Sequence, residues 1–358
     1  MKFLKSLGGN VELFLEDYTL ILASELDLMV VSSAVHNGGL KKARFLLNAQ
    51  VPRGYDQVSL HKDPEQFLLE KMRKLKIPPE HTVGMITAAD VRKFSIVTRE
   101  VNGLKVSAII TAGCSHAETA GEPIEAYVSS AGTINTVILI HGHPTESCLL
   151  QVFITAVEAK AAGLRELDIR SRYSGDLATG TITDSLAIAS TNAGATLRFG
   201  GPASKLGKIV GSCTREAVKS AIIKQGMLRP SRSVLERFAE KKLPINNVIV
   251  EMLKICPTKL NEKKVKLRIY DLFKKPFFAL VMMMAAKMDE EIKMGLIPKE
   301  LGDINELAKE FRESLLKIFG YPKPVLAPAV AEKMDFGSYP FLKNALLCFL
   351  EDVAQRES

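Results

Sequence analysis

The chain changes its hydrophobic pattern once, near residue 230, and this change constrains the fold more than any other feature of the sequence. Up to about Gln225, short apolar runs rich in β-branched residues alternate with glycine-containing turns, a pattern typical of strands. After Gly226 the pattern is helical, rich in Lys, Glu, Leu and Met, and interrupted by prolines. We therefore predict two parts, residues 1–230 with a sheet and residues 231–358 with mostly helices.

The elements within residues 1–230 predict an α+β fold. The strands that we expect lie at residues 11–17, 19–24, 28–35, 81–88, 93–101, 105–113, 132–140 and 185–191. Asn102-Gly103, between two of them, is the strongest short signal of a β-hairpin. Helical patterns occupy residues 63–75, 145–163 and 204–224. Hairpins and helices do not alternate as regular β-α-β units, so we expect a mixed or antiparallel sheet with packed helices, followed by the helical C-terminal region.

Charge and cysteine usage exclude several classes of protein. The net charge is +8, but the Lys and Arg residues are scattered and no zinc-finger or aromatic RNA-binding motif accompanies them, so we expect no nucleic-acid partner. Five cysteines without regular spacing argue against a disulfide framework. Glu25 and Asp27 interrupt the apolar stretch near the N-terminus, and the apolar run from Pro276 is too short to span a bilayer. We expect a cytoplasmic protein that does not bind membranes.

Polar and glycine residues collect where several predicted strands begin or end, which is where ligand sites often form. Asn37-Gly38-Gly39 follows one strand, and its glycines would let the backbone present N–H groups to a ligand. Asp90 follows another strand. An ordinary loop in the first case, and a capping aspartate in the second, are the alternatives.

The densest of these clusters is YSGDLATGTITDSLAIAS, residues 173–190. Thr179, Thr181 and Thr183 alternate, so in a strand they would share one face, and Gly180 would allow the close approach of a ligand. Asp184 follows directly, before an apolar run. The alternative is a β-branched strand with a capping aspartate.

Three further groups carry candidate chemistry. Thr133 and Asn135 alternate at the start of a strand, and Glu158 and Lys160 lie in a helix of otherwise small residues, where a polar stripe facing water is the alternative. Cysteine and histidine could supply a metal site, although their spacing matches no zinc motif and scattered surface histidines are the alternative. This last set consists of Cys114, His116, His141 and His143.

Seven segments, in this order, resemble the adenosylcobinamide amidohydrolase family over roughly residues 28–211. They are SSAVHNGGL, LLNAQVPRGYD, VGMITAADV, TAGCSHAETAGEP, AGTINTVILI, ITAVEAKAAGL and YSGDLATGTITDSLAIAS. The resemblance implies hydrolysis of the amide that joins a propionyl side chain of the corrin ring to aminopropanol. The products would be adenosylcobyric acid and aminopropanol or its phosphate, in the salvage of cobalamin. Cobalt would arrive with the corrinoid substrate, so we expect no cofactor and no metal bound by the protein itself.

Three positions depart from the family pattern. Ser115-His116-Ala117 stands where the resemblance leads us to expect SNA, and Ile140 precedes HGHP where we expect an asparagine at the strand end. Ile182 replaces the middle glycine of a GTGTD pattern. These departures bear on substrate preference more than on the reaction, and residues 231–358 match no fused salvage enzyme.

Amide hydrolysis needs a positioned nucleophile, donors for the oxyanion and an acid for the departing amine. We expect Asp184 to act as a base that activates either water or Thr181, and the sequence leaves the nucleophile open. The predicted catalytic set is Asp184, Thr181, Thr183, Asn135 as an oxyanion donor, and Glu158 and Lys160 as candidates for protonating the amine. The predicted substrate-binding set is Asn37, Gly38, Gly39, Asp90, Thr133 and Gly180, with Tyr55 and Tyr173 as ring-stacking contacts.

Two rival hypotheses come from other classes of function. One is a metal-dependent hydrolase built on the four cysteine and histidine residues named above. The other is a corrinoid- or tetrapyrrole-binding protein without catalytic activity, which would need the glycine-rich loops but not Asp184. In each case the partner is a small molecule, and the sequence is compatible with a homo-oligomer.

Overall fold

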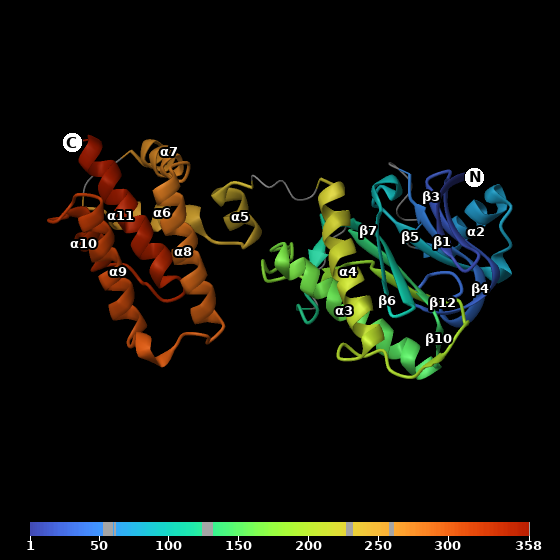
Figure 1. The fold of residues 1–358 in the computed structure, drawn as a ribbon. Helices are drawn as coiled ribbons and strands as arrows, with labels where there is room; N and C mark the ends of the chain where they lie inside the picture. The colour runs from blue at the N-terminus through green and yellow to red at the C-terminus, as the bar shows by residue number, and fades with distance from the viewer. Residues whose placement is uncertain (53–59, 61, 124–131, 227–231, 258–260, 358) are drawn as a thin grey trace. The chain divides into compact units, whose positions relative to one another are not determined.

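The structure is a computed structural model that describes residues 1–52, 60, 62–123, 132–226, 232–257 and 261–357 (Figure 1). The chain divides into two compact units, Met1–Pro230 and Ser231–Ser358.

The first unit is organised by a sheet that has nine strands within the described residues. Its main path runs β1-β2-β3-β12-β9-β7-β6, and β4 pairs with β3 and with β5. The pairs β9–β12 and β4–β5 are parallel, whereas the other pairs are antiparallel. The bounds are β1 Lys2–Gly8, β2 Val11–Glu16, β3 Thr19–Ser32, β4 Gly39–Gln50, β5 Thr82–Thr87, β6 Ser95–Val101, β7 Leu104–Gly113, β9 Thr133–His141 and β12 Ser185–Ser190. The predicted α+β class with a mixed sheet is confirmed.

The expected hairpin joins β6 and β7. Val101 pairs with Leu104, and Asn102 and Gly103 both have positive φ, +52° and +76°, as a type I′ turn requires. The prediction of two strands at residues 19–24 and 28–35 is wrong, because β3 continues through both. A register shift between Ala23 and Leu28 accommodates the polar residues there within a single strand.

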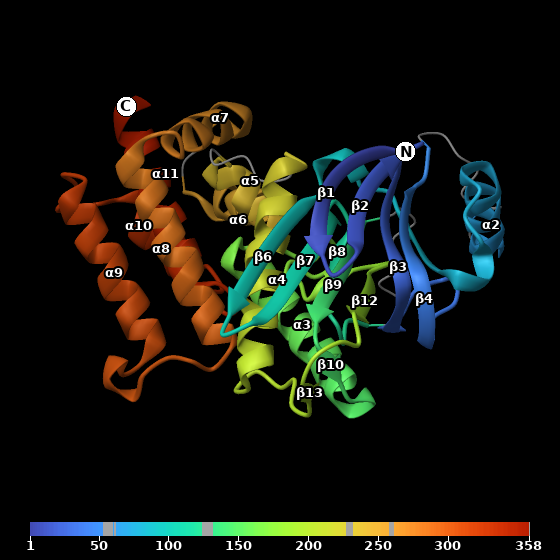
Figure 2. The same cartoon turned by 45° about the vertical axis from the view of Figure 1, so that its right-hand side comes forward.

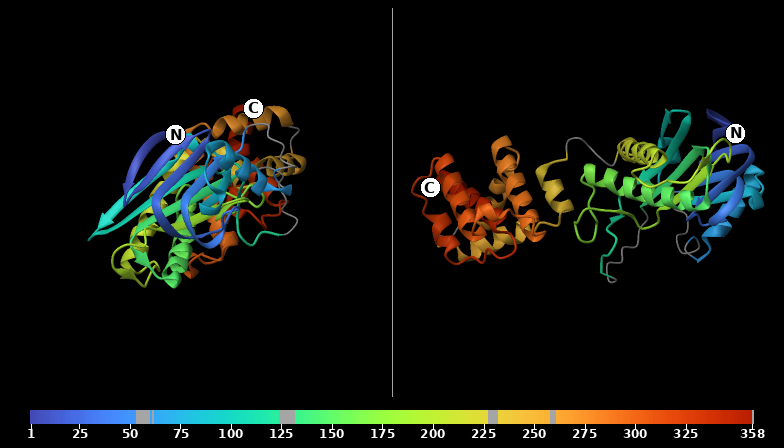
Figure 3. Two further views of the ribbon diagram at one scale, coloured as in Figure 1. Left: turned by 90° about the vertical axis from the view of Figure 1, so that its right-hand side faces the viewer. Right: turned by 60° about the horizontal axis from the view of Figure 1, so that its bottom comes forward.

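Three helices of the first unit cover the sheet at positions that the sequence predicted. They are α2 (Pro64–Leu75), α3 (Glu146–Glu166) and α4 (Lys205–Lys224). Helices α3 and α4 run beside one another (right panel of Figure 3) and share a core with β7, β9 and β12. Helix α2 packs on β4 and β5 at the other side of the unit (Figure 2).

Helix α3 extends further than the sequence suggested. It begins after Thr145, whose hydroxyl accepts the N–H of Cys148 at 3.2 Å, but Gly163 is not its end. A Cβ at Gly163 would lie 2.5 Å from Cγ1 of Val218, so this glycine allows α4 to approach closely. Among the described residues α3 is also the one helix long and apolar enough to cross a membrane; its packing against α4 and the sheet is that of a core helix.

Small strand pairs lie near the ends of the main strands. The pair β8 (Ala117–Glu118) and β11 (Gly180–Thr181) is antiparallel, and the pair β10 (His143–Pro144) and β13 (Thr196–Leu197) is parallel. They lie at opposite ends of β9, because β11 and β8 adjoin its beginning and β10 follows its last residue.

The second unit is helical and is built around its last helix. The helices are α5 (Val234–Glu240), α6 (Ile245–Ile255), α7 (Glu262–Leu272), α8 (Pro276–Lys293), α9 (Ile304–Ile318), α10 (Leu326–Ala331) and α11 (Pro340–Glu357). Helices α6 to α10 all contact α11. Phe278 and Phe319 stack at 4.8 Å between ring centroids, and Phe349 of α11 packs edge-on against Phe278 at 4.9 Å. The buried Met282 of α8 also belongs to this core.

Candidate active site

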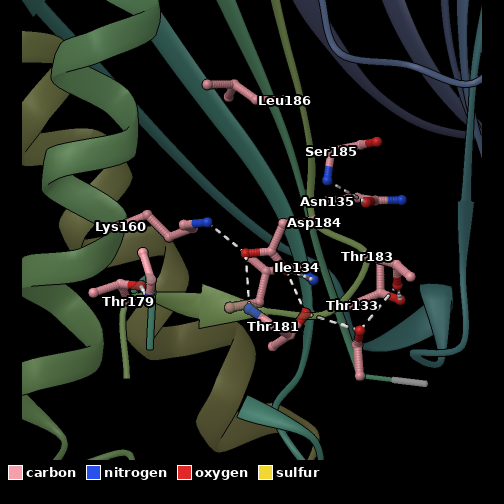
Figure 4. Close-up of polar contacts among 12 residues, drawn as sticks. Thr133, Ile134, Asn135, Lys160, Thr179, Thr181, Thr183, Asp184, Ser185 and Leu186 are labelled. Carbon is pink, nitrogen blue, oxygen red and sulfur yellow. Dashed lines mark hydrogen bonds and ion pairs between the residues drawn. The ribbon is translucent and has the colours of Figure 1, made fainter. Parts of the chain in front are cut away.

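Asp184 stands at the start of β12, beside the start of β9. The two strands are parallel neighbours and Ser185 lies opposite Asn135, so residues just before β12 meet the first residues of β9. The Oδ1 atom of Asp184 accepts the N–H of Ile134 at 2.8 Å (Figure 4). The backbone register therefore fixes this carboxylate at the edge of the sheet.

Lys160 and Thr181 complete the group around Asp184. Lys160 projects from α3 and forms an ion pair with Oδ2 of Asp184, and each of the two side chains is 14% exposed (Figure 4). The N–H of Thr181 donates to Oδ2 at 3.1 Å, and the hydroxyl of Thr181 bonds directly to Oδ1. An ammonium, a carboxylate and a hydroxyl are thus in direct contact. We call these three residues the Asp184 cluster.

Gly180 makes room for this cluster. A Cβ at position 180 would lie 2.7 Å from Oδ2 of Asp184 and 3.0 Å from Nζ of Lys160, closer than side-chain atoms tolerate. The sequence predicted that Gly180 would admit a ligand. What approaches it in the structure is the ion pair of the protein itself.

The other threonines gather around the carbonyl of Gly132. The hydroxyls of Thr181 and Thr183 reach Gly132 O at 2.8 and 3.0 Å, and Thr183 also bonds to the hydroxyl of Thr133 at 2.7 Å. Thr179 instead accepts the N–H of Ala120 at 2.9 Å. Strand β11 is only two residues long and ends at Thr181, so the three threonines do not share one face of a strand. Thr181 and Thr183 are brought to the same carbonyl by the turn that follows β11.

Asn135 is buried and its amide is already used within the sheet. Its Nδ2 donates to Oδ1 of Asn48 and to the carbonyl of Ile86, both at 2.8 Å, and its Oδ1 accepts the N–H of Ser185 at 3.2 Å. Both amide hydrogens have acceptors, so an oxyanion role would require breaking one of these bonds. We do not retain Asn135 as an oxyanion donor.

The Asn37-Gly38-Gly39 segment has a structural explanation of its own. Asn37 donates to the carbonyls of Pro79 and Thr82, at 3.0 and 2.9 Å. A Cβ at Gly38 would lie 2.5 Å from the carbonyl oxygen of Ala34, and Gly39 has a φ of +84° at the start of β4. The glycines are needed for this tight turn, and within the described residues no bond joins the segment to the Asp184 cluster.

Glu158, the other candidate for protonating the amine, does not join the Asp184 cluster. Residues two positions apart on a helix point to nearly opposite sides. Lys160 faces Asp184, whereas the exposed Glu158 lines a surface depression with Arg215 of α4. Helical geometry thus separates two residues that the sequence places side by side.

Three remaining candidates lie away from the cluster or cannot be placed. Asp90 caps the short helix η2 (Val91–Lys93) and pairs with Arg92 at 2.8 Å, and this guanidinium holds the pKa of Asp90 below its usual value. The capping interpretation therefore accounts for Asp90. Tyr173 is 43% exposed in a turn, and Tyr55 lies outside the described residues.

Comparison with known proteins adds to this geometry. The family model described as adenosylcobinamide amidohydrolase matches residues 6–230, more than half of the chain. The chain belongs to this family.

Two relatives match the chain at low sequence identity. An uncharacterized protein of Methanocaldococcus jannaschii is 26% identical over 243 residues, 62% of this chain and 91% of its own length. A protein of Methanosarcina mazei named adenosylcobinamide amidohydrolase is 30% identical over 152 residues, 42% of this chain and 66% of its own length. A solved structure of a Pyrococcus horikoshii OT3 protein covers 62% of this chain and 80% of its own, with 12% identity and a TM-score of 0.32, too weak a similarity to define the fold.

In this member of the adenosylcobinamide amidohydrolase family, the segment after β7 also reaches the Asp184 cluster. Burial raises the pKa of the Cys114 thiol to about 12, and the charge of Asp184 adds to the effect while Lys160 opposes it. His116 accepts a hydrogen bond from Arg172 at 2.5 Å, and its backbone lies against Gly132. From the sequence, both residues are candidate metal ligands. A neutral thiol here is a poor nucleophile.

Glu118 is a neighbour of the cluster that the sequence analysis missed. It lies opposite Gly180 in the β8–β11 pair, and opposed residues of an antiparallel pair project to the same face. Burial and the neighbouring Glu122 raise the pKa of Glu118. Burial alone would raise the pKa of Glu122, but hydrogen bonds from the hydroxyls of Ser171 and Ser174 outweigh it and lower this pKa. The segment TAGCSHAETAGEP contained both carboxyls, but only strand pairing showed their position.

The four residues of the rival metal site do not come together. Cys114 and His116 follow β7, near the first residue of β9, whereas His141 ends β9 and His143 lies beyond it. Nine residues of strand separate the two pairs by about 26 Å. Among the described residues, no group of three or more potential ligands could hold a metal ion. The four-ligand hypothesis is therefore wrong.

Proposed function

We propose that residues 1–230 hydrolyse the amide of adenosylcobinamide, or of its phosphate, to adenosylcobyric acid and aminopropanol or its phosphate. The proposal rests on one observation, the direct contact of Thr181, Asp184 and Lys160 at the edge of the sheet. Family membership over the same residues supports it. In a cell this reaction would serve the salvage of cobamides.

The geometry favours Thr181 as the nucleophile and Asp184 as its base. A nucleophile must lie within hydrogen-bond reach of its base, and the Thr181 hydroxyl already bonds to Oδ1 of Asp184. Lys160 lies on the other carboxylate oxygen and supplies the acid that an amine leaving group needs. The N–H bonds from Ile134 and Thr181 hold the carboxylate in one orientation.

The proposed reaction has two halves. In the first, Thr181 Oγ bonds to the amide carbon while its proton moves to Asp184, the C–N bond breaks, and the departing nitrogen takes a proton from Lys160. Asp184 then returns a proton to Lys160 across their contact. In the second half, Asp184 removes a proton from water, which attacks the ester, and Thr181 Oγ regains its proton as the acid leaves. The sum is one amide and one water converted to one acid and one amine.

Incubating the full chain with adenosylcobinamide and identifying the products by mass spectrometry tests the proposal. Adenosylcobyric acid and aminopropanol should form in equal amounts, and formation should continue after treatment with a chelator, because cobalt enters only with the substrate. Stoichiometric corrinoid binding without release of aminopropanol would instead favour the non-catalytic binding protein.

A second measurement separates Thr181 from water as the nucleophile. Acid-quenched reaction of the wild-type protein should contain an ester of the corrinoid acid on Thr181, visible as added mass on one peptide. Thr181→Ser should retain turnover and Thr181→Val should lose it. Turnover by Thr181→Val without the adduct would assign the attack to water activated by Asp184.

A further inference from the structure

The second unit contains a cavity that the proposed reaction does not use. Its volume is about 650 Å³, within the range of small-molecule sites. The wall comes from α9, α10 and the beginning of α11, which lie together in Figure 1, and from the two segments that connect these helices. All of these residues belong to Ser231–Ser358.

Arg312 of α9 is the unusual residue of this wall. Arg312 is only 8% exposed. Its guanidinium makes one hydrogen bond, from Nη1 to Oδ1 of Asn344 at 3.2 Å. Within the described part of the chain it forms no ion pair, and the exposed Glu313 next to it on α9 acts on it only through its charge. A guanidinium has five N–H donors, so four of those of Arg312 have no acceptor among the described residues. Burying a charge without an ion pair also costs free energy of folding.

Two buried carboxylates of the same unit are compensated. Asp289 accepts the N–H groups of Phe341 and Leu342 at 2.9 and 2.8 Å. Glu351 accepts those of Leu326 and Ala327 at 2.7 and 2.8 Å. The fold therefore satisfies its buried carboxylates with backbone donors, whereas Arg312 is left facing the cavity.

The rest of the wall indicates what would compensate Arg312. Lys309 and Lys317 flank it on the same helix, and neither has an ion pair in the described residues. Leu316 and Phe336 add apolar surface, together with prolines 322, 324 and 328. Glu313 and Glu332 also line the cavity, and like Lys309 and Lys317 they are exposed. The wall thus carries three cations and two carboxylates beside an apolar lining, and Arg312 is the buried charge among these five.

We propose that this cavity binds a small organic anion, whose carboxylate or phosphate group pairs with Arg312 and whose apolar part contacts Leu316 and Phe336. The planar guanidinium matches the two oxygens of either group. Asn344 holds it in place, and its own Nδ2 is fixed by the carbonyl of Pro340 at 2.8 Å. The site is separate from the Asp184 cluster and does not depend on the amidase reaction.

Titration calorimetry on the full chain, with phenyl phosphate, benzoate and the uncharged benzamide as probes, tests the proposal. At least one anion should bind with one-to-one stoichiometry and at least about tenfold more tightly than benzamide, and the preferred anion identifies the group. Arg312→Gln should weaken that binding about tenfold to hundredfold, as expected for a charge-assisted hydrogen-bonded pair. Lys333→Gln, an exposed cation outside the cavity, should leave it unchanged.

Stability supplies an independent readout. In anion-free buffer, Arg312→Gln should unfold at the same temperature as the wild type or higher, because it removes a charge that lacks a counter-ion. The anion should then raise the Tm of the wild type only. If Arg312→Gln does not fold, the double variant Lys309→Gln/Lys317→Gln should still lower the affinity several-fold. Equal binding of anion and benzamide, or undiminished anion binding by the variant that can be tested, would overturn the proposal.

Discussion

The two units treat a largely enclosed cation in opposite ways. In the first, Lys160 is paired with Asp184 and the pair is held by backbone N–H groups and the Thr181 hydroxyl. In the second, the guanidinium of Arg312 has one neutral hydrogen-bond partner, Asn344, and forms no ion pair among the described residues. In the Asp184 cluster every charged group has a partner, an arrangement suited to moving protons between its members. A buried cation without an ion pair, such as Arg312, is suited instead to binding an anion from solution.

Replacing Lys160 with Met should have the largest effect of the substitutions that test this comparison. It removes the acid for the leaving amine and leaves Asp184 without its counter-ion, so kcat should fall about 10²- to 10⁴-fold. Steady-state release of aminopropanol measures this. The control is Lys219→Met, which removes a surface ion pair with Glu166 and should leave kcat nearly unchanged. Equal kcat values for the two variants would contradict a catalytic role for Lys160.

Gly180→Ala tests whether the geometry of the first cluster matters. The new Cβ would displace Asp184 or Lys160, because it would lie 2.7 and 3.0 Å from their charged atoms. We expect kcat to fall about 10- to 100-fold, since small displacements of catalytic groups have effects of that size. Gly201→Ala is the matched control, because its Cβ would meet nothing within 4 Å. A variant at 180 as active as that at 201 would show that the ion pair is not needed in this position.

Removing residues 231–358 tests whether the two units are independent. The three residues of the Asp184 cluster lie in Met1–Pro230, which has its own sheet and core. We expect a chain ending at residue 230 to cleave the amide with kcat within about twofold of the full chain, while losing the anion site. A folded but inactive truncated chain, with folding verified by circular dichroism, would mean that the second unit contributes to catalysis.

The smallest expected effect concerns pH and the second unit. Burial raises the pKa of Asp289 to about 6, well above the usual value of an aspartate, although hydrogen bonds from the N–H groups at the start of α11 oppose the shift. The folded form then holds a proton more tightly than the unfolded form, so this group contributes stability as pH falls from 7 to 5. Between pH 7 and pH 5 the free energy of unfolding of the wild type should rise by about 1 kcal/mol relative to that of Asp289→Asn. Hydrogen exchange of the α11 amides measures this difference. An unchanged difference between the two proteins would rule out the shift.

Local signals in the sequence predicted much of the first unit. Asn102-Gly103 specified the β6–β7 hairpin, because Asn and Gly adopt positive φ more readily than other residues and both have positive φ in this turn. Strand β4 was missed, since its first half, GLKKAR, is polar and exposed and lacks strand alternation. Its pairing with β3 and β5 comes from contacts between distant segments.

The candidate site shows the same limit. Asp184, Thr181 and Lys160 were all named from the sequence, but their contact depends on how α3 packs beside the start of β12. Glu158 was named for the same reason as Lys160 and lies on the other side of the helix. The amide of Asn135 is occupied by Asn48 and Ile86, which strand pairing brings close although they are far away in the sequence. The sequence was enough to name the polar candidates, but the packing of helices and strands determines which of them are in contact.

The most direct test of the central claim is the turnover of Asp184→Asn with adenosylcobinamide, measured together with corrinoid binding. Removing the charge while keeping the shape deletes the base, so kcat should fall by about 10³-fold or more while the dissociation constant stays within a few-fold of wild type. Asp63→Asn provides the control for a capping aspartate, because Asp63 caps α2 and asparagine caps about equally well. Near-wild-type kcat for Asp184→Asn would contradict the account and leave Asp184 as a structural cap.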